Sequence, residues 1–320
     1  MALAEAVGSR DAVGVRPRLV GTGVAFVGGV FLAVQGRLNG ELGHVFRDGF
    51  LAALVSFGGG LALLLVIVLP ARAGRAGLAR LSEALRSGRI KWWQCVGGAC
   101  GAFFVSTQGL TVAALGVAAF TIAAVASQVV SSLLVDRAGL GPTRQPLTVP
   151  RVVGAVLAVP AVAVAVADDL GSQSALWLAV LPALAGIGLG WQQAVNGLVR
   201  EAAGSTRVTT LVNFTTGTAV LLVVCAVDVV VRGFPTAAPS EPWFYAGGAL
   251  GICTIGSAVL AVRFTGVLLV GLTQVAGQLV GAVAVDAIVP TAGSRLSWWT
   301  VVGTVLTLLA VAVAALPSRR

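Results

Sequence analysis

The sequence predicts an all-α polytopic membrane protein with ten transmembrane helices, arranged as two inverted five-helix repeats. Composition is the first of three supporting observations: 57% of the 320 residues are hydrophobic and only 10% are charged, against about 25% charged in soluble domains. The second is the recurrence of long apolar runs, with a mean hydropathy of +0.97 over the chain. The third is a set of polar residues that repeats at constant spacing in the two halves.

Each apolar run is about as long as the roughly 20 residues needed to cross a bilayer core of about 30 Å. The runs are uniformly apolar, which argues against the alternating strands of a membrane barrel. The third and fourth runs, like the eighth and ninth, are separated by so few polar residues that each pair predicts a tight helical hairpin. We expect spans at 19–39, 50–70, 92–110, 115–135, 149–167, 175–195, 208–231, 243–262, 267–286 and 297–316.

The positive residues predict the orientation of these spans, because Lys and Arg in short loops stay on the cytoplasmic side. Of the 21 Lys and Arg, 17 fall on one side of the ten spans. Residues 1–17 lack an apolar core and a cleavage site, so the first span serves as its own targeting signal. We therefore expect a multi-pass inner-membrane protein with both termini in the cytoplasm. The net charge of +9 is explained by these loops, and nucleic-acid binding has no support.

Polar residues inside the apolar runs reveal an internal duplication. The first offset is 157 positions, and after a longer basic loop in the first half it becomes 150. The offset of 157 relates Gln35 and Asn39 to Gln192 and Asn196, and the offset of 150 relates Trp93, Gly116, Gln128 and Asp136 to Trp243, Gly266, Gln278 and Asp286.

Each copy holds five spans, an odd number, so the second copy enters the membrane upside down relative to the first. We place the first repeat at 1–168 and the second at 169–320. Inverted repeats of this kind surround a central site in many transporters, and rocking of one repeat against the other exposes that site to each side in turn. Because both repeats lie in one chain, a monomer can contain the complete bundle.

Three stretches of the first half resemble the drug/metabolite transporter superfamily, most closely its YdcZ-like five-helix branch in the fused two-domain form. They are VQGRLNGELG, LAALVSFGGGLALL and WWQCVGGACGAFFVSTQGLTVAALGVAAFTIAAVASQVVSSLLVDRAGL, with weaker copies in the second half. The resemblance implies a ten-helix bundle and small-molecule transport, without naming a substrate. The second half departs from the pattern where SFGGG becomes NFTTG and where Arg37 becomes Ala194.

Six amide side chains are the candidate substrate-binding residues. Gln35 and Asn39 share one helix face, and the alternative to substrate binding is contact with interfacial water or a neighbouring helix. Gln128 and Gln278 lie near the middle of their spans, where an amide facing lipid is costly; Gln274 extends the same face. They either line the substrate path or link helices. The predicted set is Gln35, Asn39, Gln128, Gln192, Asn196 and Gln278.

The acidic residues offer a weaker prediction. Asp136 and Asp286 end the fourth and ninth spans, where a carboxylate is disfavoured by the helix dipole; they are candidates for ion coupling or are solvated interfacial acids. Arg37 and Glu41 have no counterpart in register and are interpreted as the water-facing edge of the first span. No acid lies near a span centre, which argues against the simplest proton-antiport scheme.

Other functional classes lack the residues that they require. The single histidine, His44, cannot complete a hydrolytic triad or a metal site, and the four cysteines lie in apolar runs, so no metal or cofactor is expected. A channel is the alternative to a transporter, but it predicts a continuous polar stripe or charged ring. We expect export of a small neutral or amphipathic metabolite or drug by alternating access, with the lipid bilayer and this substrate as the partners.

Overall fold

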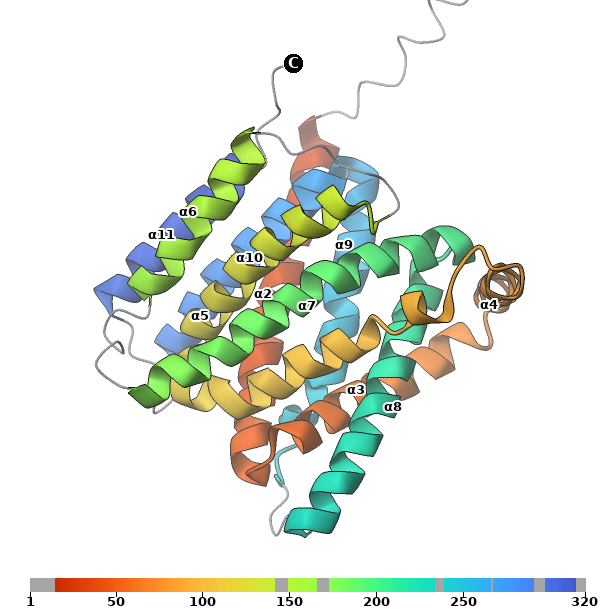
Figure 1. The fold of residues 1–320 in the computed structure, drawn as a ribbon, viewed down its shortest axis with the longest axis horizontal. Helices are drawn as coiled ribbons and strands as arrows, with labels where there is room; N and C mark the ends of the chain where they lie inside the picture. Colours follow the sequence, from red (N-terminus) through yellow and green to blue (C-terminus); the bar gives the residue numbers. More distant parts are fainter. Residues whose placement is uncertain are drawn as a thin grey trace, which may run out of the picture.

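The protein forms a bundle of helices (Figure 1) in a computed structural model that describes residues 15–141, 149–165, 173–233, 239–265, 267–290 and 297–314. Within these ranges the chain contains helices and no strands, as the predicted fold class requires. Two short 3-10 helices, η1 (Trp92–Cys95) and η3 (Pro242–Ala246), precede longer ones. The α-helices are α2 (Val15–Phe46), α3 (Gly49–Val68), α4 (Arg72–Arg86), α5 (Gly98–Ala138), α6 (Val149–Ala165), α7 (Gln173–Ala203), α8 (Thr206–Arg232), α9 (Gly247–Thr265), α10 (Val267–Ile288) and α11 (Trp298–Ala314).

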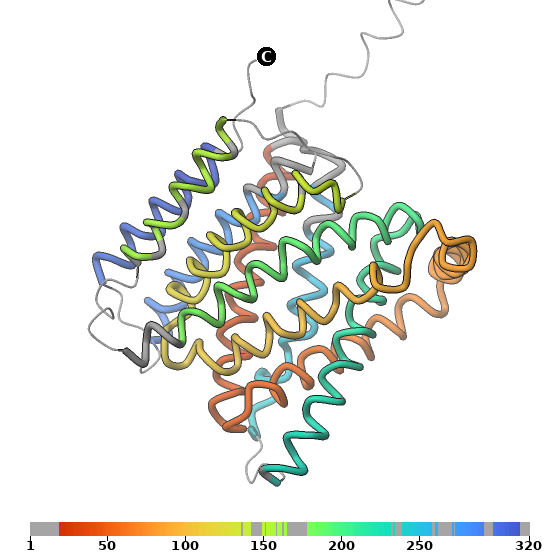
Figure 2. The backbone as a smooth tube through the Cα atoms, viewed as in Figure 1, coloured from red at the N-terminus to blue at the C-terminus, as the bar shows by residue number. Residues whose placement is uncertain are grey.

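The long helix α5 contains two of the ten predicted spans. The apolar segment Trp92–Val135 has 44 residues, about twice the length that one crossing needs. Its helical geometry is interrupted at Gly116, where φ is 81° and ψ is 162°, and the chain turns back there (Figure 2). The third and fourth spans are therefore joined at one glycine. Gly266, the corresponding position between α9 and α10, lies outside the described residues.

The basic segment after α3 is helical, a feature that the sequence pattern did not predict. In α4 the apolar side chain of Leu81 is buried while the arginines lie at the surface. Arg80 Nε donates to the Ala203 carbonyl at the end of α7 at 2.9 Å, and Arg75 Nη1 donates to the Pro70 carbonyl at 2.7 Å. Cations at helix C-termini satisfy carbonyls that have no partner within the helix. This helix therefore connects the first repeat to the second.

The helices pack in pairs that follow the internal duplication. In the first repeat α2 packs against α9 and α10, and in the second repeat α7, the counterpart of α2, packs against both halves of α5. The equivalent helices α3 and α8 contact each other, as do α6 and α11, which lie side by side at one edge of the bundle (Figure 1). This packing has the pseudo-twofold pattern expected of inverted repeats.

Equivalent helices also begin in the same way. Asp48 precedes α3, and its Oδ1 accepts hydrogen bonds from the backbone N–H groups of Phe50 at 2.8 Å and Leu51 at 3.1 Å. Its counterpart Ser205, 157 positions later, precedes α8 and accepts from the N–H of Val208 at 3.4 Å. A side-chain oxygen at this position satisfies N–H groups that the helix itself leaves unpaired. Both repeats therefore use an N-cap to start their second span.

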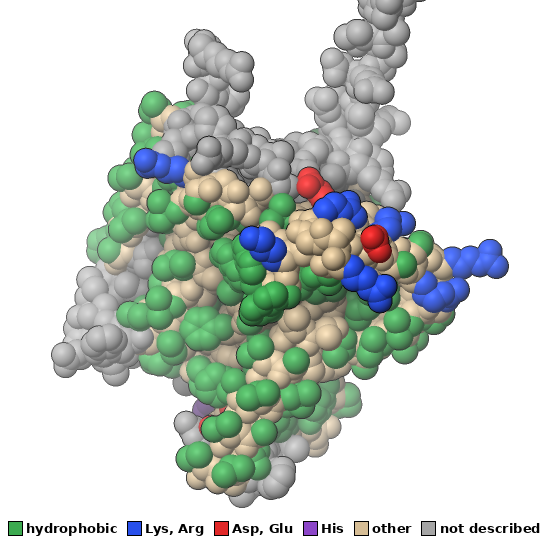
Figure 3. Space-filling model, turned by 45° about the vertical axis from the view of Figure 1, so that its right-hand side comes forward, with side chains coloured by type: hydrophobic (Ala, Val, Ile, Leu, Met, Phe, Trp, Pro, Cys, Tyr) green, Lys and Arg blue, Asp and Glu red, His purple; other side chains and the backbone are tan. Residues whose placement is uncertain are grey.

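The surface separates into an apolar belt and a basic end. Large apolar side chains such as Val66, Val230 and Ile288 are exposed along the helices, as expected where lipid replaces water. Figure 3 shows the Lys and Arg side chains gathered toward one part of the face in view, above a mainly hydrophobic surface. We call the end that carries α4 and the α7–α8 turn the basic end, and the end that carries Gly116 and the α2–α3 turn the opposite end.

Two phenylalanines meet at the centre of the pseudo-twofold arrangement. The rings of Phe57 in α3 and Phe214 in α8 have centroids 5.0 Å apart, within the range of favourable aromatic pairs. Each ring also occupies the space beside a glycine of the other repeat: a Cβ added to Gly60 would overlap Phe214, and one added to Gly217 would overlap Phe57. Glycine is required at both positions so that α3 and α8 can approach closely.

This interlock predicts the effect of adding one methyl group to α3. Gly60→Ala is expected to lower the free energy of unfolding by about 1–3 kcal/mol, because the new Cβ overlaps the Phe214 ring and the core must shift. Thermal unfolding of the detergent-purified protein measures the change. Gly58→Ala on the same helix is the matched control, since nothing lies within 4 Å of its added Cβ. Equal stability of the two variants would contradict the interlock.

Candidate functional site

A cavity of about 610 Å³ lies between the two repeats. Most of its wall comes from α2, α5, α7, α9 and α10, with single contributions or pairs from α3, α8 and α11. None of the lining residues that the structure describes is charged, and the wall combines apolar side chains with amides and hydroxyls. The polar members are Gln35, Gln128, Ser132, Gln192, Gln193, Asn196, Asn213, Thr254, Gln274 and Gln278.

Five of the six amides predicted from the sequence line this cavity, and the structure brings them together from four helices. Gln35 comes from α2, Gln128 from α5, Gln192 and Asn196 from α7, and Gln278 from α10. Gln128 and Gln278 avoid lipid by facing the cavity, which agrees with the cost of a lipid-facing amide at a span centre. Whether these side chains bind a substrate is taken up under the proposed function.

Gln35 and Gln192 occupy equivalent places, each seated against a glycine of the other helix group. A Cβ at Gly251 would lie 3.2 Å from Gln35 Nε2, and a Cβ at Gly101 would lie 3.0 Å from Gln192 Nε2. Gly101 and Gly251 are themselves related by the offset of 150. Each glycine therefore makes room for one amide, and the two contacts repeat the same geometry on the two sides of the cavity.

The Oε1 atoms of Gln35 and Gln192 are both buried without a hydrogen-bond partner in the protein. Gln192 Nε2 donates to Asn213 Oδ1 at 3.3 Å, which orients that amide. A buried polar oxygen without a partner costs free energy, so each of these acceptors gains from a donor that enters the cavity. Groups bearing N–H or O–H can supply that donor.

Asn39 is the predicted residue that the cavity lining does not include. It is 0% exposed, and its Nδ2 donates to Gln108 Oε1 at 2.7 Å within the packed opposite end. Gln108 lies in the apolar third span beside Ser106 and Thr107, and this short polar group was the sequence signal that could have identified it. Its counterpart position in the second repeat is Ala258, so this hydrogen bond exists in the first repeat alone.

Four further polar residues of the lining were not predicted: Ser132, Gln193, Asn213 and Thr254. Asn213 stands where the second repeat departs from the SFGGG pattern of the first, which was a usable signal. Gln193 adjoins Gln192 in the sequence and is exposed, whereas Gln192 is partly buried. Ser132 and Thr254 carry small hydroxyls, which are too common in membrane helices to single out from sequence.

The two aspartates do not line the cavity among the described residues. The Asp286 carboxylate accepts hydrogen bonds from the backbone N–H of Val117 at 3.0 Å and of Ala118 at 2.7 Å. It is 4% exposed, so it is not a solvated interfacial acid. The side chain of Asp136 lies outside the described residues. Asp286 thus has a structural role in the state described, and a role in ion coupling stays a prediction for both residues.

Arg37 also differs from the expectation of a water-facing edge. Its Nη2 forms an ion pair with Glu41 Oε1 at 2.8 Å, and its side chain is only 12% exposed. Sequence alone could not show this, because the side chains that cover Arg37 come from distant parts of the chain.

The geometry defines a polytopic membrane protein whose two inverted repeats enclose an uncharged, amide-lined cavity. A family model described as "Putative inner membrane exporter, YdcZ" matches the chain twice, at residues 20–164 and 177–313. The chain belongs to this family, and the double match confirms the fused form with two repeats. It is accordingly a membrane transport protein.

Two further comparisons add little about function. No curated protein matches the chain. A solved structure described only as "Crystal structure of protein" shares 20% sequence identity over 93% of this chain and 96% of its own length, with a TM-score of 0.52. At this identity the likeness supports the fold alone.

The different surroundings of Asn39 and Asn196 predict different effects of the same substitution. Asn39→Ala is expected to destabilise the protein by about 1 kcal/mol or more, because Gln108 Oε1 is left buried without its donor. Asn196→Ala, at the equivalent position but facing the cavity, is expected to change stability by less than about 0.5 kcal/mol. Thermal unfolding in detergent compares them directly. An equal loss in both variants would show that the Asn39 hydrogen bond contributes nothing specific.

Proposed function

We propose that this protein is an alternating-access exporter of small neutral or amphipathic molecules, described here with its cavity open toward the basic end. One observation supports the proposal. Equivalent residues of the two repeats line the centre of the cavity, whereas the residues that line the rest of it have counterparts that do not line the cavity. Eighteen of the 26 lining residues form nine pairs related by the two sequence offsets. Gln35 with Gln192, Gln128 with Gln278 and Phe57 with Phe214 are examples.

The eight unpaired lining residues all lie nearer the basic end of their helices. They are Val129, Ser132, Leu133, Gln193, Asn196, Asn213, Gly271 and Val311. Gln193 and Gly271 are exposed, so the cavity reaches the surface on this side. The cavity is therefore symmetric at its centre and extends beyond the centre in one direction.

Their counterparts at the opposite end are mostly buried in packed structure. Asn196 lines the cavity while Asn39 is 0% exposed, and Ser132 lines it while Ala282 is 0% exposed. Equivalent sequence positions thus have open surroundings at one end and closed surroundings at the other. Exchange of these two environments between the repeats would open the opposite end and close the basic end, which is the alternating-access cycle of inverted repeats.

The chemistry of the lining supports an uncharged or amphipathic substrate. Amides and hydroxyls offer hydrogen bonds, and Phe57, Phe104 and Phe214 offer apolar surface, whereas no fixed charge among the described lining residues balances a strongly ionic ligand. With the basic end in the cytoplasm, as the charge distribution predicts, the cavity would accept molecules from the cytoplasm, in keeping with export.

A reciprocal cysteine-labelling experiment tests alternating access against the channel alternative. In a variant without native cysteines, Ser132→Cys is expected to react with a membrane-impermeant maleimide added from the basic side, and Ala282→Cys to stay protected. Labelling in oriented vesicles measures both rates. A substrate that favours the other state should slow the first reaction and speed the second. A cysteine that reacts equally from both sides, with no reciprocal change, would favour a channel.

A ligand screen addresses the substrate class. Metabolites and amphipathic drugs are tested for thermal stabilisation of wild type and of the Gln128→Ala/Gln278→Ala double variant. A cavity ligand at a concentration of 100 times its Kd should stabilise wild type by about 2.7 kcal/mol, with a clearly smaller effect on the variant. Val280→Ala, an exposed position on the same helix as Gln278, is the matched control. Equal stabilisation of wild type and the double variant would place the ligand outside this cavity.

A further inference from the structure

A partly buried cluster of charged residues, Arg37, Glu41 and Asp286, lies at the opposite end, at the glycine break of α5. Gly116 has a φ of 81°, a conformation that glycine adopts without steric cost and other residues avoid. Beyond it, the second half of α5 begins at Val117, which is 1% exposed. The first N–H groups of a new helix have no carbonyl four residues earlier to bond, and here they face the protein interior.

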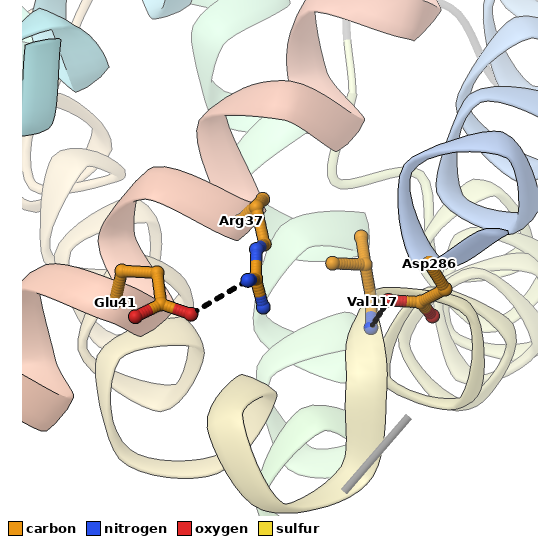
Figure 4. Close-up of polar contacts among 4 residues, drawn as sticks. All are labelled: Arg37, Glu41, Val117 and Asp286. Carbon is orange, nitrogen blue, oxygen red and sulfur yellow. Dashed lines mark hydrogen bonds and ion pairs between the residues drawn. The ribbon is translucent and has the colours of Figure 1, made fainter. Parts of the chain in front are cut away.

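Asp286 supplies the missing acceptor from another repeat. It lies near the end of α10 and accepts hydrogen bonds from the Val117 and Ala118 N–H groups with its two oxygens, at 3.0 and 2.7 Å. Figure 4 shows the contact with Val117. Hydrogen bonds to an ionised carboxylate are stronger than those between neutral groups, and the dipole at a helix N-terminus favours the negative charge. This contact fastens α10 of the second repeat to α5 of the first.

Arg37 of α2 completes the cluster. Figure 4 shows its guanidinium between Glu41 and the contact of Val117 with Asp286. The guanidinium forms its ion pair with Glu41, at 2.8 Å, within α2 itself. Arg37 Nη1 is buried without a hydrogen-bond partner. Three helices from both repeats, α2, α5 and α10, therefore meet at one set of opposite charges.

We propose that Asp286 and Arg37 form a lock that holds the opposite end of the transporter closed and so favours the state open at the basic end. The inference rests on the proposed alternating access, since a lock matters only if that end opens. Separation of α10 from the start of α5 would break both backbone hydrogen bonds of Asp286 and move the carboxylate away from Arg37. The lock must open before the cavity can reach the opposite side.

The second repeat has no cation at the position that corresponds to Arg37. Asp136 is the repeat counterpart of Asp286, but Ala194 stands in place of Arg37. The first repeat contributes a cation at the opposite end and the second contributes none at the basic end. This difference gives the two otherwise equivalent ends unequal stability in their closed forms, in the direction that the asymmetric cavity shows.

Distances between spin labels on the two ends test the lock. In protein without its native cysteines, reconstituted in lipid nanodiscs, labels at the exposed positions Ala114 and Ile288 report the separation of α5 and α10 at the opposite end. Labels at the exposed positions Leu134 and Arg200 report the separation of α5 and α7 at the basic end. Pulsed electron–electron double resonance gives the distance distribution for each pair, and hence the populations of the two states.

Asp286→Asn should raise the ratio of opposite-open to basic-open protein by about tenfold, the effect expected for the loss of a hydrogen bond to a charged group. Arg37→Gln should raise the same ratio, because it removes the cation that lies beside the Val117–Asp286 contact. The Ala114–Ile288 distance then lengthens and the Leu134–Arg200 distance shortens. Glu41→Gln is the matched control, because Glu41 is ion-paired only within α2 and should leave both distributions unchanged. Size-exclusion chromatography checks that each variant is folded; if Asp286→Asn does not fold, Arg37→Gln provides the test.

The outcomes separate the lock from the proposed function. A longer opposite-end distance with an unchanged basic-end distance would support the lock and overturn alternating access. Unchanged distances in folded Arg37→Gln would overturn the lock, as would an equal response in Glu41→Gln. Ala194→Arg provides a test by gain of function: a cation added at the position that corresponds to Arg37 should shorten the Leu134–Arg200 distance, and a lengthening would contradict the proposal.

Discussion

The close approach of glycine backbones between the two repeats is the constraint on which the rest of this structure depends. In a bilayer the hydrophobic effect does not drive helices together, so association relies on packing contacts and hydrogen bonds. The backbone of α2 at Gly29 lies against the backbone of α10 at Gln278, and the equivalent Gly186 of α7 lies against α5 at Ala124. A side chain at either glycine would push the helices apart. The same closeness brings amides from different helices to face one cavity.

This packing explains how one set of contacts can support two arrangements of the bundle. Equivalent glycines make equivalent contacts in the two repeats. The two repeats therefore pack in the same way, and equivalent residues line the centre of the cavity. The differences lie in the polar and charged residues at the ends: Gln108 and Arg37 have Ala258 and Ala194 as counterparts. The two repeats thus have the same helix packing. In the proposed cycle, the preference of the protein for the state open at the basic end comes from a few residues that differ between the repeats.

Much of the architecture could be predicted from the sequence because its signals are local or periodic. The lengths of the apolar runs predicted the spans, and the recurrence of amides predicted both the duplication and five members of the cavity wall. The short polar break between the third and fourth runs predicted a hairpin, and the structure places its turn at Gly116. Each of these features depends on residues that are close together in the sequence.

The remaining features depend on contacts between distant parts of the chain. The helical form of α4 was missed because its arginines resemble a solvated loop until the carbonyl groups that they cap are known. Asp286 looked unfavourable at the end of its own helix, yet it stabilises the start of another helix 169 residues away in the chain. Asn39 and Asn196 looked identical in the repeat pattern, and only the conformation described distinguishes a packed amide from a cavity-facing one.

The reciprocal pairing of Phe57 with Gly217 and of Phe214 with Gly60 has a consequence for how such a fused chain can evolve. The glycine of each half leaves room for the phenylalanine ring of the other half. A larger ring or an extra methyl group in one half is therefore tolerated only with a matching change in the other half. The halves inherited from one ancestral unit have become a matched set. Exchange of one half with that of a distant relative would therefore separate each ring from the glycine that makes room for it.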